Sequence, residues 1–428
     1  MKYSEVETIY TIVVEKKDLN YVSKVVSKFY RGWIKVSTEK SLKEGYVIEI
    51  KPGYGRSRLV NPKYVVEYAG ARNLSSIPPL ELVRTIERAR ARLRLTATYN
   101  ECFVLSEEGE KLYGLEPHPG YDMFFLIGAD TVCLLKELGM ENPPETPLVL
   151  RKFRGVHDIY SGPRIVGRLT IPDEGRELIL EEVSNERYSN DFNLLLDKNK
   201  SIIMEHMRIS SKIFEITGNP DIVVVSFSGG KDSIVVLDLA IKCYGKNKVY
   251  PIYVDTGLEF PETIEYVSKV QEYYGIEVVK AFAKIDEAVK EKGLPTKTNR
   301  WCTGLKTKAF KEKLEEITRG YEQVLVVVGD RDAESVSRSH RSPVRKLSDK
   351  MIEVAPIKQW STAHVQLYMY LNKLPVNPLY EQGFYRIGCY ICPALRSLEL
   401  YIMTRKLWNR LCGKEFIEEF LREKKWVK

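Results

Sequence analysis

Residues 223–233 read Val-Val-Val-Ser-Phe-Ser-Gly-Gly-Lys-Asp-Ser, and the apolar residues 234–240 follow directly. A β-branched run that leads into small residues and then into a second apolar run predicts a buried strand, a tight turn and a helix. The N-terminus of such a helix offers free N–H groups and the positive end of the helix dipole, and both attract anions. The stretch is therefore typical of a loop that binds phosphate groups.

The residue types of this loop suit phosphate binding in different ways. Gly229 and Gly230 let the backbone approach phosphate oxygens because they carry no Cβ atom. Lys231 adds a positive charge, and Asp232 is suited to holding a Mg²⁺ ion that the phosphates share. Serine hydroxyls can donate further hydrogen bonds. We expect nucleotide contacts from Ser226, Ser228, Gly229, Gly230, Lys231, Asp232 and Ser233.

The loop is similar to the Ser-Gly-Gly-Lys-Asp-Ser loop of the PP-loop ATP pyrophosphatases, and further motifs narrow the resemblance. These motifs are Asp-Thr-Gly-Leu-Glu-Phe-Pro-Glu-Thr at 255–263, Trp-Cys-Thr-Gly-Leu-Lys at 301–306, Gly-Asp-Arg-Asp-Ala-Glu-Ser-Val-Ser-Arg at 329–338 and Pro-Ile-Lys-Gln-Trp-Ser-Thr at 356–362. Together with the loop they occur in family order between residues 221 and 395. In this region the chain resembles the phosphoadenosine phosphosulfate (PAPS) reductase family.

The resemblance implies an α/β fold with a parallel-sheet, adenine-nucleotide α-hydrolase-like (PP-loop) catalytic domain. The sequence agrees, because predicted strands and helices alternate between residues 222 and 328, which indicates a parallel sheet with right-handed crossovers. Thr362 is expected to cap a helix. Arg331 and Arg338 are planar donors suited to phosphate or sulfate oxygens. The family motifs add Asp255, Thr256, Gly257, Glu262, Gly329 and Arg331 to the expected nucleotide contacts. The expected catalytic residues are Lys231, Asp232, Arg331 and Arg338.

The chain of 428 residues is long enough for two or three domains. We expect a small α+β module at 1–75. At 76–180 we expect a basic helix and a β-rich, barrel-like module that is similar to PUA-type RNA-binding modules. A helical connector at 181–220 and the catalytic domain at 221–428 complete the prediction.

The helix predicted at 80–94 carries arginines around an apolar stripe formed by Leu82, Ile86, Ala89 and Leu93. This pattern favours either a face that binds RNA phosphates or a solvated helix flank. The net charge of +8 is compatible with an RNA partner such as tRNA, and equally with a solvated surface.

Cys302, Cys389 and Cys392 are expected to share one metal centre, because two loops of the predicted site carry them. Three thiolates suit a [4Fe–4S] cluster with one open iron, or a zinc ion if His340 or His364 joins them. The C-x-x-C pair is also compatible with a redox dithiol that binds no metal.

The complete loop favours an enzyme that binds ATP, cleaves it to AMP and pyrophosphate and adenylates a substrate, with sulfur transfer to RNA as the expected outcome. Sulfonucleotide reduction is the first alternative, because Cys412 lies in a Cys-Gly pair that resembles the catalytic tail of those reductases. We expect a helix from Leu398 to Leu411, and a purely structural role at the end of this helix also fits Cys412. Nucleotidyl transfer, as in FAD synthetases, and nucleotide sensing without turnover stay open.

The location of the protein follows from what the sequence does not contain. No apolar run approaches eighteen residues, and the first residues do not resemble a signal peptide. We therefore expect a cytoplasmic protein without a membrane partner, and the pattern predicts no particular oligomeric state.

Overall fold

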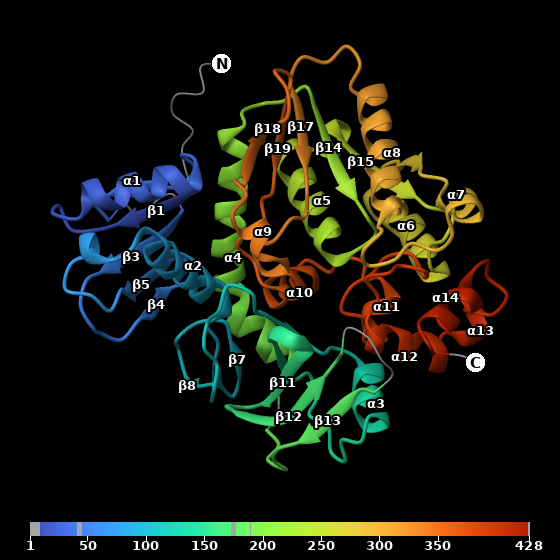
Figure 1. Ribbon diagram of the computed structural model, residues 1–428, viewed down its shortest axis with the longest axis horizontal. Helices are drawn as coiled ribbons and strands as arrows, with labels where there is room; N and C mark the ends of the chain where they lie inside the picture. Colours follow the sequence, from blue (N-terminus) through green and yellow to red (C-terminus); the bar gives the residue numbers. More distant parts are fainter. Residues whose placement is uncertain (1–8, 41–44, 173–176, 189, 427–428) are drawn as a thin grey trace.

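The computed structural model describes residues 9–40, 45–172, 177–188 and 190–426 (Figure 1). Its largest sheet has six strands in the order β16-β15-β14-β17-β19-β18. Neighbouring strands are parallel except for β18 and β19, which confirms the predicted parallel-sheet α/β domain. The strands are β14 (Ile222–Phe227), β15 (Val249–Asp255), β16 (Val279–Phe282), β17 (Val324–Val327), β18 (Val344–Lys346) and β19 (Met351–Val354).

The strand order determines where a ligand can bind. Strand β15 pairs with one edge of β14, and β16 pairs with β15. Strand β17, which follows β16 in the chain, pairs with the opposite edge of β14. The loops that follow β14 and β17 therefore leave the sheet in opposite directions, and in open parallel sheets ligands bind at such a switch point, at the carboxyl ends of the strands. Both of these loops carry motifs that the sequence singles out.

The two faces of β14 pack into different apolar cores, because side chains alternate along a strand. Val223 and Val225 belong to a core that continues through the N-terminal half of the chain. Ile222 and Val224 belong to a second core on the other face.

The helices of this domain are α5 (Lys231–Tyr244), α6 (Pro261–Tyr274), α7 (Ile285–Lys292), α8 (Trp301–Ile317), α9 (Val336–Ser339), α10 (Thr362–Leu371), α11 (Pro378–Glu381), α12 (Ser397–Arg405), α13 (Trp408–Leu411) and α14 (Ile417–Glu423).

Two local predictions in this domain were wrong. The helix expected from Leu398 to Leu411 is broken into α12 and α13, because the N–H groups of Lys406 and Leu407 both bond the Ile402 carbonyl and Leu407 turns into the core. The cap of α10 is Ser361 rather than Thr362, since the Ser361 hydroxyl accepts the His364 N–H and Thr362 is the first helical residue.

The first module is a five-stranded sheet of order β2-β1-β3-β5-β4 with two helices. Helix α2, which we predicted to belong with the following module, packs on β3 and β5 of this sheet. The elements of the first module are β1 (Tyr10–Val13), α1 (Leu19–Tyr30), β2 (Lys35–Ser37), β3 (Tyr46–Lys51), β4 (Arg58–Asn61), β5 (Tyr64–Tyr68) and α2 (Pro79–Leu95).

The second module is rich in β-strands, as expected, but it is not a barrel. Its main sheet has the order β13-β12-β11-β10-β9, so β13 and β9 are its two edges. The 25-residue helix α4 (Phe192–Ile216) then leads to the large sheet and packs on α5 and α10. The remaining elements are β6 (Thr98–Asn100), β7 (Cys102–Val104), β8 (Glu110–Lys111), β9 (Asp122–Phe125), α3 (Ala129–Glu137), β10 (Leu148–Arg151), β11 (Val156–Ser161), β12 (Arg164–Thr170) and β13 (Ile179–Glu182). Within the described ranges, no helix has the length and apolar character needed to cross a bilayer.

Candidate nucleotide-binding site

The predicted phosphate loop connects β14, which ends at Phe227, to α5, which begins at Lys231. Gly229 has a φ of +71°, and a Cβ atom there would lie 3.0 Å from the Thr263 Cγ2 methyl. The position therefore requires glycine on both conformational and steric grounds. Gly230 precedes α5 as its N-cap residue, so the helix N-terminus faces the turn as predicted.

Serine hydroxyls hold the loop in this shape. The Ser233 hydroxyl donates a hydrogen bond of 2.8 Å to the Gly230 carbonyl and accepts the Ser228 N–H at 3.2 Å. The Ser228 hydroxyl lies 3.3 Å from that of Ser233. Ser226 is a half-buried residue of β14. In this structure, Ser228 and Ser233 bond the loop to itself.

The segment after α10 braces the loop from the other side, which the sequence did not indicate. The Asn377 amide donates to the Gly229 carbonyl at 3.1 Å and to the Thr263 hydroxyl at 3.2 Å. The Tyr380 hydroxyl accepts the backbone N–H of Lys231 at 3.0 Å. A phosphate oxygen that took this N–H would displace the Tyr380 hydroxyl.

The Lys231 side chain is enclosed at the start of α5. Its Nζ lies 3.2 Å from Asp232 Oδ2, donates to the Tyr385 carbonyl at 3.3 Å and lies 5.4 and 5.2 Å from the ring centroids of Tyr380 and Tyr385. Burial lowers the pKa of Lys231, but the Asp232 carboxylate together with Tyr380 and Tyr385 outweighs burial and raises the pKa above its ordinary value. Lys231 therefore keeps its charge inside the protein.

The loop after β17 meets the loop after β14 through Arg331, which is buried. The Arg331 Nε donates to Asp232 Oδ1 at 2.6 Å, and its two terminal nitrogens donate to Asp122 Oδ2 at 3.2 Å and to the Thr362 hydroxyl at 2.9 Å. Gly329 lies so close that a Cβ atom would be 3.1 Å from the Asp232 carbonyl carbon. Arg331 was predicted to bind phosphate, but the structure places it as a brace beneath the phosphate loop.

Asp122, from β9 of the second module, completes this arrangement, and sequence reasoning missed it. Its carboxylate accepts the Thr362 N–H at 2.9 Å, the Thr362 hydroxyl at 2.7 Å and the Tyr385 hydroxyl at 2.7 Å, in addition to Arg331. Burial would raise the pKa of Asp122, but Arg331, Arg151 and these hydrogen bonds lower it well below its usual range. The N-terminal half of the chain thus contributes a buried charge to the site.

The Asp232 carboxylate does not fit its predicted role as a magnesium ligand. One oxygen accepts from Arg331 and the other from Lys231, so two cations already neutralise it. The charges of Arg331 and Lys231 lower the pKa of Asp232 although burial would raise it.

The loop after β15 carries the next predicted contacts. The Asp255 carboxylate accepts the Gly257 N–H at 2.9 Å, and the Thr256 hydroxyl donates to Glu259 Oε1 at 2.6 Å. Gly257 has a φ of +78°, and a Cβ atom there would lie 2.5 Å from the Asp286 carboxyl carbon. These residues lie at the carboxyl end of the strand beside β14, as the parallel sheet predicts.

Two predicted residues are engaged away from the phosphate loop. Arg338 forms ion pairs with Asp330 at 3.0 Å and with Glu334. The buried Glu262, at the start of α6, pairs with Arg410 at 3.0 Å. Among the residues that the structure describes, neither the Arg338 nor the Glu262 side chain makes a hydrogen bond or ion pair with residues 226–233.

The three cysteines of the predicted metal centre lie around Lys306 of α8. The pKa of Lys306 is raised, although burial opposes the shift, because Cys389, Glu259, Cys392 and Cys302 surround it. Across residues 9–40, 45–172, 177–188 and 190–426, no three His, Cys, Asp or Glu side chains converge closely enough to hold a metal ion. The predicted three-cysteine centre, as a cluster or as a zinc site, is therefore not formed among the residues that the structure describes.

Apart from the exposed Arg84, the arginines of α2 are engaged within the protein, and they form neither a continuous RNA-binding face nor a solvated flank. Arg90 is fully buried, with its guanidinium 2.7 Å from Glu87 and 2.5 Å from Asp332. Arg88 and Arg92 share the buried Glu67 at 2.6 and 3.0 Å. Arg90 thus attaches the helix to the catalytic domain, whereas Arg88 and Arg92 attach it to β5 of its own module.

A parallel α/β sheet with a glycine-rich strand-to-helix loop at its switch point defines a nucleotide-binding protein of the PP-loop type. Residues 222–395 match the phosphoadenosine phosphosulfate reductase domain. An adenosine 5'-phosphosulfate reductase of Bacillus subtilis is 30% identical over 204 residues, which cover 46% of this chain and 83% of that protein. The chain belongs to the PAPS reductase family of the PP-loop superfamily.

The N-terminal half lies outside the matched domain. An uncharacterized protein of Methanocaldococcus jannaschii is 36% identical over 251 residues, which cover 55% of this chain and 51% of that protein. The chain thus spans about half the length of this relative. The PAPS reductase of Candida auris in its phosphate complex is 20% identical with a TM-score of 0.33, covering 45% of this chain and 97% of that one.

Proposed function

We propose that the chain binds ATP at the phosphate loop, cleaves it to AMP and pyrophosphate and adenylates an acceptor. The observation that carries this proposal is the complete Ser-Gly-Gly-Lys-Asp-Ser loop at the N-terminus of α5. The N–H groups of the loop and the charged Lys231 suit the leaving pyrophosphate, on which negative charge develops as the bond to the α-phosphate breaks. Asp232 and Arg331 act on the loop by holding Lys231 in place.

The acceptor and the following chemistry belong to the same proposal. Among relatives, the adenosine 5'-phosphosulfate reductases are named for a sulfur-bearing adenine nucleotide, which supports sulfur transfer after adenylation. RNA as the acceptor rests on the basic N-terminal region and on a cluster with an open iron. The ion pairs of Arg88, Arg90 and Arg92 within the protein weaken the first of these two grounds.

Calorimetric titration of ATP and a pyrophosphate-release assay test the proposal. Lys231→Ala is expected to weaken ATP binding at least about tenfold, because it removes a charge-assisted contact to phosphate. Lys242→Ala is the matched control, since Lys242 lies on the same helix and pairs with Asp238 at 2.8 Å. Equal ATP affinity in the Lys231 variant and the native protein would contradict the proposal.

Reduction of adenosine 5'-phosphosulfate to sulfite is the second candidate. It is favoured by the identity to reductases over about four-fifths of their length and by Cys412, which is exposed at the end of α13. The assay supplies the sulfonucleotide with dithiothreitol as the reductant and measures sulfite. Sulfite release that needs Cys412 and no ATP would establish this activity in place of adenylation.

A further inference from the structure

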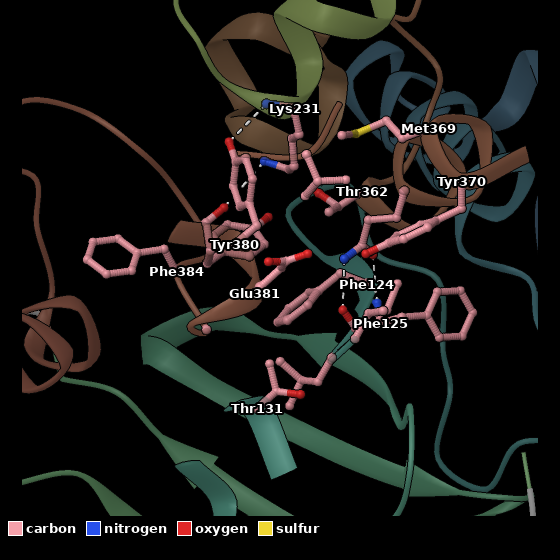
Figure 2. Close-up of a pocket in the computed structure, with 16 residues that line it drawn as sticks. Phe124, Phe125, Thr131, Lys231, Thr362, Met369, Tyr370, Tyr380, Glu381 and Phe384 are labelled. Carbon is pink, nitrogen blue, oxygen red and sulfur yellow. Dashed lines mark hydrogen bonds between the residues drawn. The ribbon is translucent and has the colours of Figure 1, made fainter. Parts of the chain in front are cut away.

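A groove on the first module is much larger than the pocket beside Lys231 (Figure 2). That pocket has a volume of about 40 Å³, which is enough for only a few water molecules. The groove has a volume of about 310 Å³ and lies outside residues 222–395, which match the reductase domain. A cavity of this size reaches the range of ligand-binding sites. The residues that line the groove are Lys51, Arg56, Arg58, Val66, Tyr68 and Glu107.

The groove lies on the face of the first sheet that points away from α2. Helix α2 packs on β3 and β5. The core beneath it holds one neighbour in sequence of each groove strand residue, namely Ile50, Leu59 and Val65. Because successive side chains of a strand point to opposite faces, Lys51, Arg58 and Val66 lie on the other face. The strand register agrees, since Arg58 is paired with Val66.

The loop between β3 and β4 forms a wall of the groove, and its shape is fixed. Gly53 has a φ of +85°, and its N–H donates to the Ala71 carbonyl at 2.5 Å. A Cβ atom at Gly55 would lie 2.4 Å from the Tyr68 ring, so only glycine lets the loop rest on this ring. The Ser57 hydroxyl accepts the Tyr68 N–H at 3.1 Å. The groove is therefore preformed.

The three cations of the groove are weakly engaged by the protein. Arg58 is exposed, and among the residues that the structure describes its guanidinium makes no hydrogen bond or ion pair. Arg56 is 67% exposed and lies 4.0 Å from Glu107, and Lys51 lies 3.6 Å from Glu49. Exposed pairs of this kind contribute little to stability. Phosphate oxygens can therefore take over these cations, with which they form stronger, charge-assisted hydrogen bonds.

Two further side chains indicate which kind of anion fits. Tyr54, in the same loop, is 89% exposed. Exposed aromatic rings beside arginines and lysines are typical of proteins that bind single strands, because bases stack on the rings while the cations hold the phosphates. The Glu107 carboxylate repels phosphate, but it can accept a hydrogen bond from a ribose 2′-hydroxyl, which RNA carries and DNA lacks.

We propose that this groove binds single-stranded RNA. Lys51, Arg56 and Arg58 hold the phosphates, a base stacks on Tyr54, and Glu107 accepts a ribose hydroxyl. The inference goes beyond the proposed function, because the groove binds RNA whether or not the phosphate loop cleaves ATP. It also assigns RNA contact to the open face of the first sheet rather than to α2.

Fluorescence anisotropy of a labelled single-stranded RNA of about 12 nucleotides tests the proposal. The affinity of the native protein is expected to fall about fourfold when the salt concentration doubles, because three phosphate contacts give a slope of about −2. Arg56→Gln/Arg58→Gln should weaken binding at least about tenfold and reduce the slope to about −0.7. Thermal unfolding should be unchanged, since both arginines are exposed.

A matched double variant controls for the loss of two surface charges. Arg84→Gln/Arg208→Gln removes two arginines that are 75% and 70% exposed on α2 and α4, and it should bind RNA like the native protein. Native RNA affinity in Arg56→Gln/Arg58→Gln, an equal loss in the control, or no RNA binding by the native protein would overturn the proposal.

Two further comparisons test the assigned class of ligand. Tyr54→Ala is expected to weaken RNA binding at least about fivefold, whereas Tyr113→Ala, which changes a tyrosine that is 68% exposed in the second module, should not. Single-stranded DNA of the same sequence should bind at least about threefold more weakly than RNA, and Glu107→Ala should remove this difference. Native affinity in Tyr54→Ala, or equal binding of DNA and RNA by the native protein, would overturn the assignment.

Titration with ATP keeps this inference separate from the proposed function. None of the groove residues belongs to the phosphate loop, so all of these variants should bind ATP within about twofold of the native value. A native protein that does not bind ATP contradicts the proposed function and leaves the RNA measurements intact. Loss of RNA binding with native ATP affinity has the opposite meaning.

Discussion

The Asp122 carboxylate lies 3.2 Å from the Arg331 guanidinium, although 209 residues separate the two along the chain. Asp122 belongs to the second module, and Arg331 holds Asp232 beside the phosphate loop. A buried ion pair is strongly destabilised when one partner is removed, because the other charge remains without compensation. The pair therefore connects the N-terminal half of the chain to the shape of the nucleotide site.

Asp122→Asn is expected to lower both stability and ATP affinity. The substitution keeps the size of the side chain but leaves Arg331 with one carboxylate, at a cost of roughly 3–5 kcal/mol. Thermal unfolding and ATP titration measure the two effects. Asp158→Asn is the control, because Asp158 is equally buried and pairs with Arg168 at 2.9 Å in the same sheet. If both variants bind ATP alike, Asp122 has no role in the site.

Arg90→Met is expected to destabilise the protein by roughly 3 kcal/mol or more, since Asp332 and Glu87 lose a buried partner. Chemical denaturation of the single variants and of Arg90→Met/Asp332→Asn gives the coupling energy, for which we expect about 1 kcal/mol or more. Arg84→Met on the same helix should change stability by no more than about 0.5 kcal/mol, because Arg84 is exposed. Equal effects at the two positions would contradict the observed burial.

Glu399→Gln is expected to stabilise the protein in a pH-dependent way. Burial raises the pKa of Glu399, on α12, to about 7. Because the pKa is higher in the folded chain, protonation stabilises the folded state below about pH 4, and this contribution is lost as the pH rises through about 7. The variant should therefore match the native protein at pH 4 and exceed its unfolding free energy at pH 8 by on the order of 3 kcal/mol. A difference in unfolding free energy between the two proteins that does not change with pH would contradict the raised pKa of Glu399.

Gly257→Ala and Gly304→Ala are expected to have opposite effects. At Gly257 the positive φ and the close Asp286 carboxylate both oppose a side chain, and we expect a loss of about 1–3 kcal/mol. At Gly304, in helix α8, no atom lies within 4 Å of the added methyl group, and alanine should stabilise the helix by up to about 1 kcal/mol. Thermal unfolding midpoints measure both changes. A stabilised Gly257→Ala variant would contradict the loop geometry.

Cys412→Ala separates the two candidate activities. Cys412 is exposed at the end of α13, so the substitution should leave folding unchanged. Adenylation predicts that pyrophosphate release survives the change. Loss of sulfite production from adenosine 5'-phosphosulfate in this variant, with native production intact, would support reduction instead.

The sequence predicted the features that local patterns encode. The strand, turn and helix around Gly229 follow from residues that are neighbours in the chain, and the alternation of strands and helices predicts the parallel sheet. Asp122 was missed because it lies in the apolar run 121–127, where no local pattern indicates a distant arginine partner. Arg90 was misinterpreted for a related reason, since helical periodicity separates apolar from polar faces but does not show that the catalytic domain covers Arg90.

The cysteines show a similar limit. The spacing of Cys389 and Cys392 and the position of Cys302 predict that the three thiols come together, and all three lie near enough to one residue to help raise its pKa. That residue is Lys306, four positions after Cys302 on α8, and its ammonium cannot serve as a metal ligand while it is protonated. Which group lies near the thiols depends on packing, which sequence spacing does not determine.

The pairing of Asp122 with Arg331 also affects how the protein is made. During translation Asp122 leaves the ribosome first, and the 209 residues that separate it from Arg331 take on the order of 10–40 s to synthesise. Throughout that interval the nascent N-terminal half exposes a carboxylate and the β9 edge that later packs on α10. The first half of the chain thus emerges with an unfinished surface, and it depends on the last third of the polypeptide to complete it.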